Sequence, residues 1–296
     1  MPAAAGRRRA RAGGGTAWLY AMPALLMFAV FILYPIAANI IESLVDAHGS
    51  ATAANYQQAA TDPVFWTALR NSVVWVVLSV ALETAIGFGL GLAIAMYIPR
   101  AQALFRTLLF LPMVITPSVV ALVFTTIYAP DYGLIFGLFN SLGLGGSFPA
   151  ILGDPATATV GVILVNVWQW CGFFVLMYCV GLAQVDRELL SAAAIDGATG
   201  FALVRHVIWP LLRPATTSLI VLGTIQALQQ FPLIFLMTEG GPANSTQTLA
   251  TYIFQTGFTL NEMHYASAIA VVLFVLSLGI IMLQYRWGQT QQTADA

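Results

Sequence analysis

Long uncharged, apolar runs dominate this chain and alternate with short charged segments. A transmembrane helix needs about 20 predominantly apolar residues. Six runs reach that length, and Glu83 in the second run is their one acidic or basic residue apart from a histidine at the edge of the sixth. The predicted spans are approximately 17–41, 71–98, 107–129, 158–184, 214–238 and 264–285. A further uncharged stretch at 132–153 is broken by glycines and Pro149, which predicts an external loop with a short interfacial helix near 133–142.

The arginines gather on one side of this six-span arrangement. All except Arg70 lie in the two tails or in the loops after the second and fourth spans. Cytoplasmic loops are enriched in basic residues, so both termini are predicted to be cytoplasmic. The organisation is then a tail at 1–16, one membrane domain at 17–288 and a tail at 289–296. The alternative is that the arginine-rich start is a secretory signal peptide, although its apolar run exceeds the usual length.

Composition excludes several classes of protein. Apolar residues make up 59% of the 296 residues and charged residues only 8%, against roughly 25% charged in soluble domains. All eleven basic residues are arginine, so the chain has neither a Schiff-base lysine nor the lysine of a P-loop. A net charge of −1 does not fit a nucleic-acid binder. Cys171 and Cys179 lie about 12 Å apart on one predicted helix and cannot form a disulfide with each other.

The segment between the fourth and fifth spans is predicted to form two short helices joined by a tight turn. Asp186 is placed to cap a short helix that runs through three alanines, and Gly197 supplies a left-handed residue to end it. A second short helix is predicted to run to Pro210. The small side chains would let another surface approach closely. The alternative is an amphipathic connector that lies on the lipid headgroups.

This segment resembles the EAA loop of binding-protein-dependent ABC importers, whose pattern is Glu-Ala-Ala, two residues, Asp-Gly-Ala, and later Ile-x-Leu-Pro. The matching positions are Ala192, Ala193, Asp196, Gly197, Ala198, Ile208 and Pro210. Ser191 replaces the glutamate of the pattern, which removes a carboxylate available to a basic residue of the ATPase, and Trp209 replaces a leucine. Further segments, among them Tyr34-Pro35 and Met237-Thr238-x-Gly240-Gly241-Pro242, are similar to permeases of the maltose and glycerol-3-phosphate type.

The resemblance implies an all-α type I importer permease with six transmembrane helices and a coupling loop at 185–213. It implies these partners: a second six-span permease, in most systems a different chain; two ATPase subunits; and an external binding protein that delivers a sugar. The chain itself would be no enzyme and hold no cofactor or metal, because ATP and Mg²⁺ would bind the ATPase. The residues expected to contact the ATPase are Ser191, Ala192, Ala193, Asp196, Gly197 and Ala198.

Polar side chains inside predicted spans mark a candidate solute path, since such groups are expensive in a bilayer. One face of the fourth span carries Asn166, Gln169, Trp170 and Phe173 at helical spacing. The fifth span carries Gln226, Gln229 and Gln230. The resemblance places the first four, with Gln226 and Gln230, at sugar-contact positions. Arginine is absent from the predicted spans, which favours a neutral sugar over a phosphate ester. The alternative is that these amides join helices, for about 0.6 kcal/mol each.

Glu83, near the centre of the second span, would cost about 2.5–3.5 kcal/mol if ionised in lipid. It is therefore expected to be protonated or to face a neighbouring helix. Its presence leaves open a stand-alone secondary carrier or channel that uses Glu83, a class that often shows inverted repeats. An integral membrane enzyme would need a nucleophile and base, or a metal site, at one depth. The Gly87-x-x-x-Gly91 motif predicts a close-packing helix face.

Overall fold

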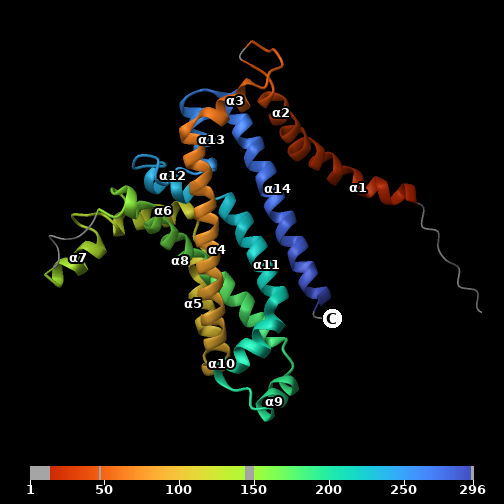
Figure 1. Cartoon of the computed structure of the whole chain (residues 1–296), viewed down its shortest axis with the longest axis vertical. Helices are drawn as coiled ribbons and strands as arrows, with labels where there is room; N and C mark the ends of the chain where they lie inside the picture. The colour runs from red at the N-terminus through yellow and green to blue at the C-terminus, as the bar shows by residue number, and fades with distance from the viewer. Residues whose placement is uncertain (1–13, 47, 144–149, 295–296) are drawn as a thin grey trace, which may run out of the picture.

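The structure is a computed structural model that describes residues 14–46, 48–143 and 150–294 (Figure 1). Within these ranges the ordered elements are helices, and the β-type pairing is one isolated bridge between Val45 and Ala51. Five helical segments are long and apolar enough to cross a membrane, and a bent pair makes a sixth if it counts as one span. The predicted all-helical membrane fold is confirmed.

The helices follow the predicted spans with several additions. The first half of the described chain contains α1 (Gly14–Phe28), a π-helical turn (Ala29–Leu33), α2 (Tyr34–Ser43), α3 (Ala54–Thr61), α4 (Pro63–Tyr97), α5 (Gln102–Val114), α6 (Pro117–Ile127) and α7 (Leu134–Ser141). The second half contains α8 (Pro155–Ala183), α9 (Arg187–Ile195), α10 (Gly200–Leu203), a π-helical turn (Val204–Ile208), α11 (Trp209–Leu228), α12 (Pro232–Thr238), α13 (Leu249–Phe254), a π-helical turn (Gln255–Thr259) and α14 (Met263–Ala294). Helix α7 occupies the place predicted for the short interfacial helix.

Helices α4 and α8 form the centre of the bundle. Every third or fourth residue of α4 is buried, as expected for a helix that presents one face to its neighbours. A Cβ atom added at Gly87 would lie 2.4 Å from the Cβ of Phe174, and one added at Gly91 would lie 2.9 Å from the Cβ of Tyr178. The two glycines therefore let α4 and α8 approach closely, as the Gly-x-x-x-Gly motif predicts.

The third predicted span, 107–129, is divided in the structure. Helices α5 and α6 meet at an angle of 95°. Pro117 disfavours a helical conformation for Thr116, and both Ile115 and Thr116 are extended. Hydropathy alone predicts one span here, and the signal for the break is the restriction that a proline places on the preceding residue.

The fifth span also differs from its prediction. Helix α10, the π-helical turn and α11 form one continuous segment from Gly200 to Leu228, so the second short helix does not end at Pro210 as predicted. The N–H of Trp209 bonds to the carbonyl of Val204, and this wider turn precedes a proline that has no N–H of its own. The helix then stops before Pro232, and α12 forms a separate short helix that packs against α6.

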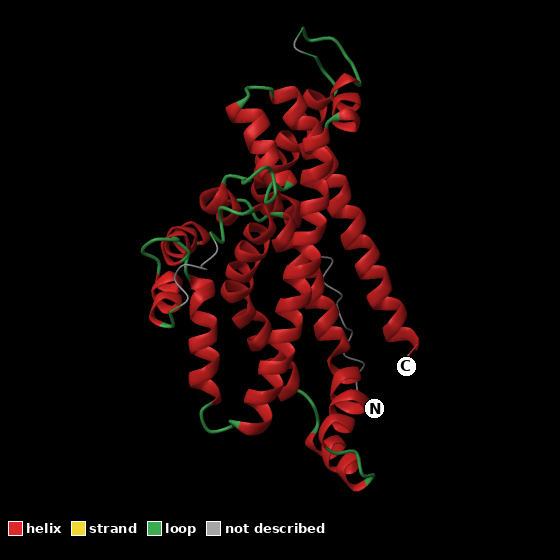
Figure 2. Ribbon diagram, turned by 60° about the vertical axis from the view of Figure 1, so that its left-hand side comes forward, coloured by secondary structure: helices red, strands yellow, loops and turns green. Residues whose placement is uncertain are grey.

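The first span reaches away from the bundle. Helix α2 packs against α14, whereas α1 extends away from the other helices (Figure 1). The most apolar window of the segment Tyr20–Ser43 has none of its residues buried. The other long helices run roughly along one direction, as Figure 2 shows. The short helices α3 and α13 lie at one end of the bundle, and α9 lies at the opposite end (Figure 1).

Candidate functional site

The segment at 185–201, called the knob below, has the helix caps that its sequence predicts. The carboxylate of Asp186 accepts a hydrogen bond of 2.9 Å from the N–H of Glu188 and so caps α9. Gly197 has a φ of 84°, and the N–H groups of Gly197 and Ala198 donate to the carbonyls of Ala194 and Ala193. This is a Schellman motif, which satisfies carbonyl groups that a helix end leaves free.

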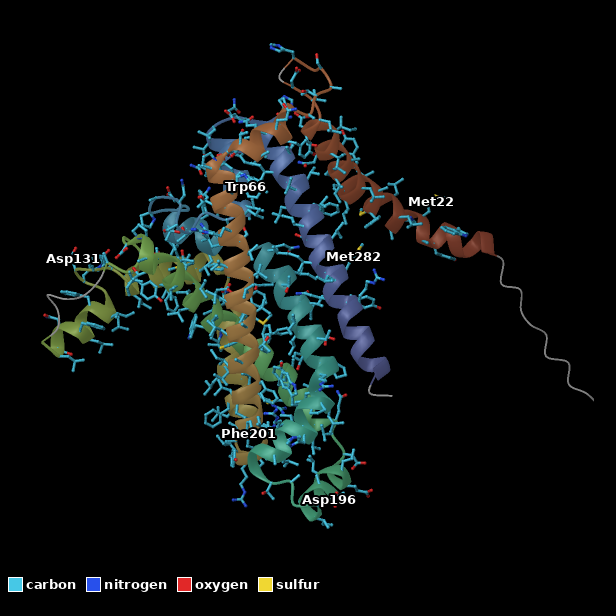
Figure 3. The ribbon with its side chains drawn as sticks, viewed as in Figure 1. Met22, Trp66, Asp131, Asp196, Phe201 and Met282 are labelled. Carbon is cyan, nitrogen blue, oxygen red and sulfur yellow. The ribbon has the colours of Figure 1, made fainter. Side chains whose placement is uncertain are left out.

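The knob exposes apolar side chains. Ile195 and Phe201 have exposed fractions of 86% and 76%, and Leu189 is also exposed. Phe201 and Asp196 lie at the end of the molecule farthest from Trp66 (Figure 3). Sequence reasoning predicted the alanine surface but missed these larger side chains, although their exposure follows from their place beside a tight turn. Exposed apolar side chains grouped on such a turn are typical of a protein interaction surface.

Four of the polar residues inside the bundle form one hydrogen-bonded network. The Nδ2 of Asn166 on α8 donates to the Oε1 of Glu83 on α4, at 2.9 Å. The Oδ1 of Asn166 accepts from the Nε2 of Gln230, at 2.8 Å, and from the Nε2 of Gln226, at 3.4 Å. Glu83 and Asn166 are completely buried. The structure thus brings together three of the predicted pathway residues and adds Glu83 as their partner.

The other predicted pathway residues lie elsewhere. Gln169 is buried, and its Nε2 donates to the carbonyl of Ile115 at the break between α5 and α6, at 2.8 Å. Its Oε1 and the Nε1 of Trp170 have no hydrogen-bond partner within the described part of the chain. Trp170 and Phe173 are half-buried, and Gln229 is exposed. On the predicted face of α8, both ends of the Asn166 amide are therefore hydrogen-bonded, whereas Gln169 and Trp170 each have a buried polar atom without a partner among the described residues.

A carboxylate joins three helices at the end of the bundle opposite the knob. The Oδ2 of Asp62 accepts hydrogen bonds from the hydroxyls of Tyr252 and Tyr265, the latter at 2.6 Å, while its Oδ1 caps α4 through the N–H of Val64. Burial alone would raise the pKa of Asp62, but these hydrogen bonds outweigh it and hold the pKa below its ordinary value. Burial, followed by the bond to Asp62, raises the pKa of Tyr252 to about 12.

Replacing Asp62 with asparagine is expected to destabilise the protein by about 1 kcal/mol at pH 7, because charge-assisted bonds to two hydroxyls are lost at a partly exposed site. The pKa of Asp62 is lowered from 3.8 in the folded state, so its contribution is complete above that value and disappears as the pH falls through the folded pKa. The difference in melting temperature between wild type and Asp62→Asn should therefore begin to shrink below about pH 4 and continue to shrink as the pH falls further.

Asp154 supplies the matched control, because its carboxylate caps α8 through the N–H of Ala156 in the same way. Asp154→Asn should cost less, since the bonds to the two tyrosine hydroxyls belong to Asp62. Equal losses from both variants, or a difference between Asp62→Asn and wild type that does not shrink as the pH falls below 3.8, would contradict the role given to the tyrosines.

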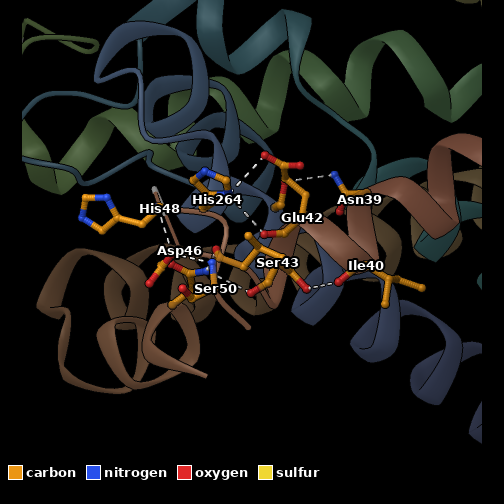
Figure 4. Close-up of polar contacts among 11 residues, drawn as sticks. Asn39, Ile40, Glu42, Ser43, Asp46, His48, Ser50 and His264 are labelled. Carbon is orange, nitrogen blue, oxygen red and sulfur yellow. Dashed lines mark hydrogen bonds and ion pairs between the residues drawn. The ribbon is translucent and has the colours of Figure 1, made fainter. Parts of the chain in front are cut away.

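A second polar group fastens α2 to α14 at this end (Figure 4). The Nδ1 of His264 lies 3.1 Å from the Oε1 of Glu42, and both side chains are partly exposed. Nearby, Asp46 accepts hydrogen bonds from the N–H groups of His48 and Ser50. Exposed pairs of this kind contribute little to stability. Across the described residues, no group of three or more His, Cys, Asp or Glu side chains is arranged to hold a metal ion.

Comparison with known proteins identifies the family. The family described as "Binding-protein-dependent transport system inner membrane component" matches residues 85–286. The probable ABC transporter permease protein YurN of Bacillus subtilis (strain 168) is 32% identical over 280 residues, or 92% of this chain and 96% of YurN. The lactose transport system permease protein LacF of Rhizobium radiobacter is 32% identical over 275 residues, or 90% of this chain and 92% of LacF.

A solved structure shares the fold. It is that of a bacterial ABC transporter involved in the import of the acidic polysaccharide alginate, with a TM-score of 0.83 and 22% identity over 93% of this chain and 96% of that chain. The resemblance inferred from the EAA loop is confirmed, and the family supplies a membrane component that is not itself catalytic. A stand-alone carrier and a membrane enzyme are thereby set aside. The chain belongs to the inner-membrane component family of binding-protein-dependent transport systems and is a multi-pass permease of the ABC transporter type.

Proposed function

We propose that this permease forms half of the translocation path of an ATP-driven importer of neutral carbohydrates. Its domain at 17–288 would pair with a second six-span permease, two ATPase subunits that bind ATP and Mg²⁺, and an external solute-binding protein. The knob and the helices α3 and α13 lie at opposite ends of the bundle (Figure 1), which supports a cytoplasmic position for the knob and both termini. The arginines in the loops on the knob side support the same orientation, because cytoplasmic loops are enriched in basic residues.

The observation that carries the proposal is the exposed, capped knob. Leu189, Ile195 and Phe201 present apolar surface at the knob end of the bundle, and a protein partner that covers them removes that surface from water. The alanines of α9 allow close approach. Because Ser191 replaces the glutamate of the EAA pattern, docking on the ATPase would depend on apolar contact more than on an ion pair.

The names of the relatives support a carbohydrate as the solute. LacF is described as a lactose permease, and the structural neighbour imports alginate. In this chain the candidate face of α8 offers amides and aromatic rings, which suit the hydroxyls and apolar faces of a sugar. Arginine is absent from that face, which favours a neutral solute over an acidic one.

Within the candidate path, Gln169, Trp170 and Gln226 each have a buried polar atom without a partner in the described structure. Gln169 and Trp170 are the preferred solute contacts, because Gln226 also donates to Asn166. Phe173 lies one turn further along the same face. Asn166, Gln226 and Gln230 are hydrogen-bonded to one another in this conformation and would reach the solute only after the helices rearrange. Gln229 is exposed outside this network.

The double variant Gln169→Ala with Trp170→Ala should raise the KM for transport about tenfold, since each polar group that binds solute contributes of the order of 1 kcal/mol. The complex should still assemble. Trp168→Ala is the matched control, because that side chain is exposed and lies on another face of α8. Unchanged transport kinetics in the first variant, measured in proteoliposomes, would remove these residues from the path.

The proposed function is tested by affinity purification of this chain from its native membrane, followed by mass spectrometry. We expect recovery of an ATPase with a P-loop lysine and of a second permease, and added external binding protein should stimulate ATP hydrolysis by that complex. Screening of the binding protein against sugars then identifies the solute. A chain that purifies alone and moves a solute into liposomes without ATP would overturn the proposal.

A further inference from the structure

Glu83 is buried in the middle of α4, and the transport function proposed above gives this residue no role. Its exposed fraction is zero, and its Oε1 accepts the hydrogen bond from Asn166 at 2.9 Å. Its Oε2 has no partner among the described residues, and neither has the hydroxyl of Ser79, one helical turn earlier. A buried acid that is only half satisfied is costly, so its presence asks for a physical reason.

That reason lies in the direction of the hydrogen bonds. An amide side chain has a donating end and an accepting end. Since Oε1 of Glu83 offers only an acceptor, Asn166 must turn its NH₂ group toward α4 and its carbonyl toward α11. The carbonyl then receives the NH₂ groups of Gln230 and Gln226. Glu83 thus sets the orientation of every donor and acceptor in the network, whether or not its other oxygen carries a proton.

The network lies at the far end of the helix that begins at the knob. One continuous helical segment runs from Gly200 to Leu228, and Gln226 is in its last turn. Gln230 follows directly, in the break before α12. Asn166 and Glu83 therefore fasten the inner end of that segment to α8 and α4. Movement of the segment must either carry α4 and α8 with it or exchange these hydrogen bonds.

We infer that Glu83 is a positioning residue that acts through Asn166 to link the knob-bearing helix to α4 and α8, and that this link couples ATP hydrolysis to solute movement. The inference rests on the proposed function. A link of this kind biases a transition between two conformations, because its hydrogen bonds are present in one arrangement of the helices and altered in the other. The unpaired Oε2 of Glu83 provides a place for a new bond after the helices move.

The test compares Glu83→Gln with Glu83→Met in the assembled transporter, using solute transported per ATP hydrolysed as the readout. Glutamine keeps an oxygen that accepts from Asn166, so Glu83→Gln should stay within about twofold of wild type. Methionine has similar volume but offers no comparable acceptor, so Glu83→Met should lower the ratio about tenfold, as expected when a buried amide loses its partner. The amount of assembled complex, measured by size exclusion, should be similar for both variants.

A double-mutant cycle with Asn166→Ala shows whether Glu83 acts through Asn166. The effects of Glu83→Met and Asn166→Ala should be far from additive, because each removes the same link. Additive effects, a wild-type ratio in Glu83→Met, or equal loss in Glu83→Gln and Glu83→Met would overturn the inference, the last result pointing to a role for the acid proton. If instead the wild-type complex moves solute without consuming ATP, the proposed function fails and not merely the role of Glu83.

Discussion

Transport should fall at least tenfold when Gly197 is replaced with leucine, while the amount of protein in the membrane stays close to that of wild type. Gly197 has a φ of 84°, where a side chain is strained. An added Cβ atom meets nothing within 4 Å, so the strain acts on the turn and leaves the bundle core unchanged. Relief of the strain shifts the cap of α9 and with it the exposed Ile195. Solute uptake and ATP hydrolysis by the purified complex provide the measurement.

Gly49 offers a close control for this variant. It has a φ of 82°, also with no atom within 4 Å of an added Cβ, but it lies in the loop at the opposite end of the bundle. Gly49→Leu imposes similar local strain away from the knob and should transport at nearly the wild-type rate. Full transport in Gly197→Leu, or equal loss in both variants, would contradict docking of the ATPase at the knob.

A leucine at Gly87 should prevent normal folding of the permease. Its Cβ would lie 2.4 Å from the Cβ of Phe174 and 3.1 Å from the carbonyl carbon of the same residue, so α4 and α8 would have to separate. Forcing atoms into a packed helix contact costs about 3 kcal/mol, and more where backbone cannot move. We expect little protein in the membrane fraction and a melting temperature about 6–12 °C lower in what remains, at about 2–4 °C per kcal/mol.

Gly89 lies on the same helix two residues away, and an added Cβ there meets nothing within 4 Å. Gly89→Leu should be neutral or stabilising by about 0.5–1 kcal/mol, because leucine is a better helix former than glycine. An equal loss of protein yield and melting temperature in both variants would show that α4 tolerates no larger residue at either position. It would contradict the claim that Gly87 is needed for the close contact between α4 and α8.

The features that the sequence predicts well are those determined by local physical chemistry. Uncharged length located the helices, and Asp186 and Gly197 marked the ends of α9 because caps depend on neighbouring backbone groups alone. The Gly87-x-x-x-Gly91 motif likewise announced a close contact without naming its partner. The breaks before Pro117 and Pro232 were also readable, had the restriction on the residue before a proline been weighed against hydropathy.

The features that escaped prediction depend on residues far apart in the chain. The helix face of Asn166 predicts a place in a solute path, but its partners Glu83 and Gln226 come from α4 and α11, 83 and 60 residues away. The carbonyl that Gln169 bonds is free only because α5 ends at that point. The contact of Asp62 with two tyrosines required the packing of α13 and α14 over the start of α4. No local pattern specifies such partners.

The unbroken helical segment from Gly200 to Leu228 has a mechanical consequence. Its 29 residues span about 42 Å at 1.5 Å per residue. A tilt of about 5° around its knob end would displace Gln226 by roughly 3.5 Å, which exceeds the range over which a hydrogen bond survives. The segment therefore amplifies motion: a rotation too small to disturb the packing of the knob is large enough, at the depth of Asn166, to replace one set of hydrogen bonds with another.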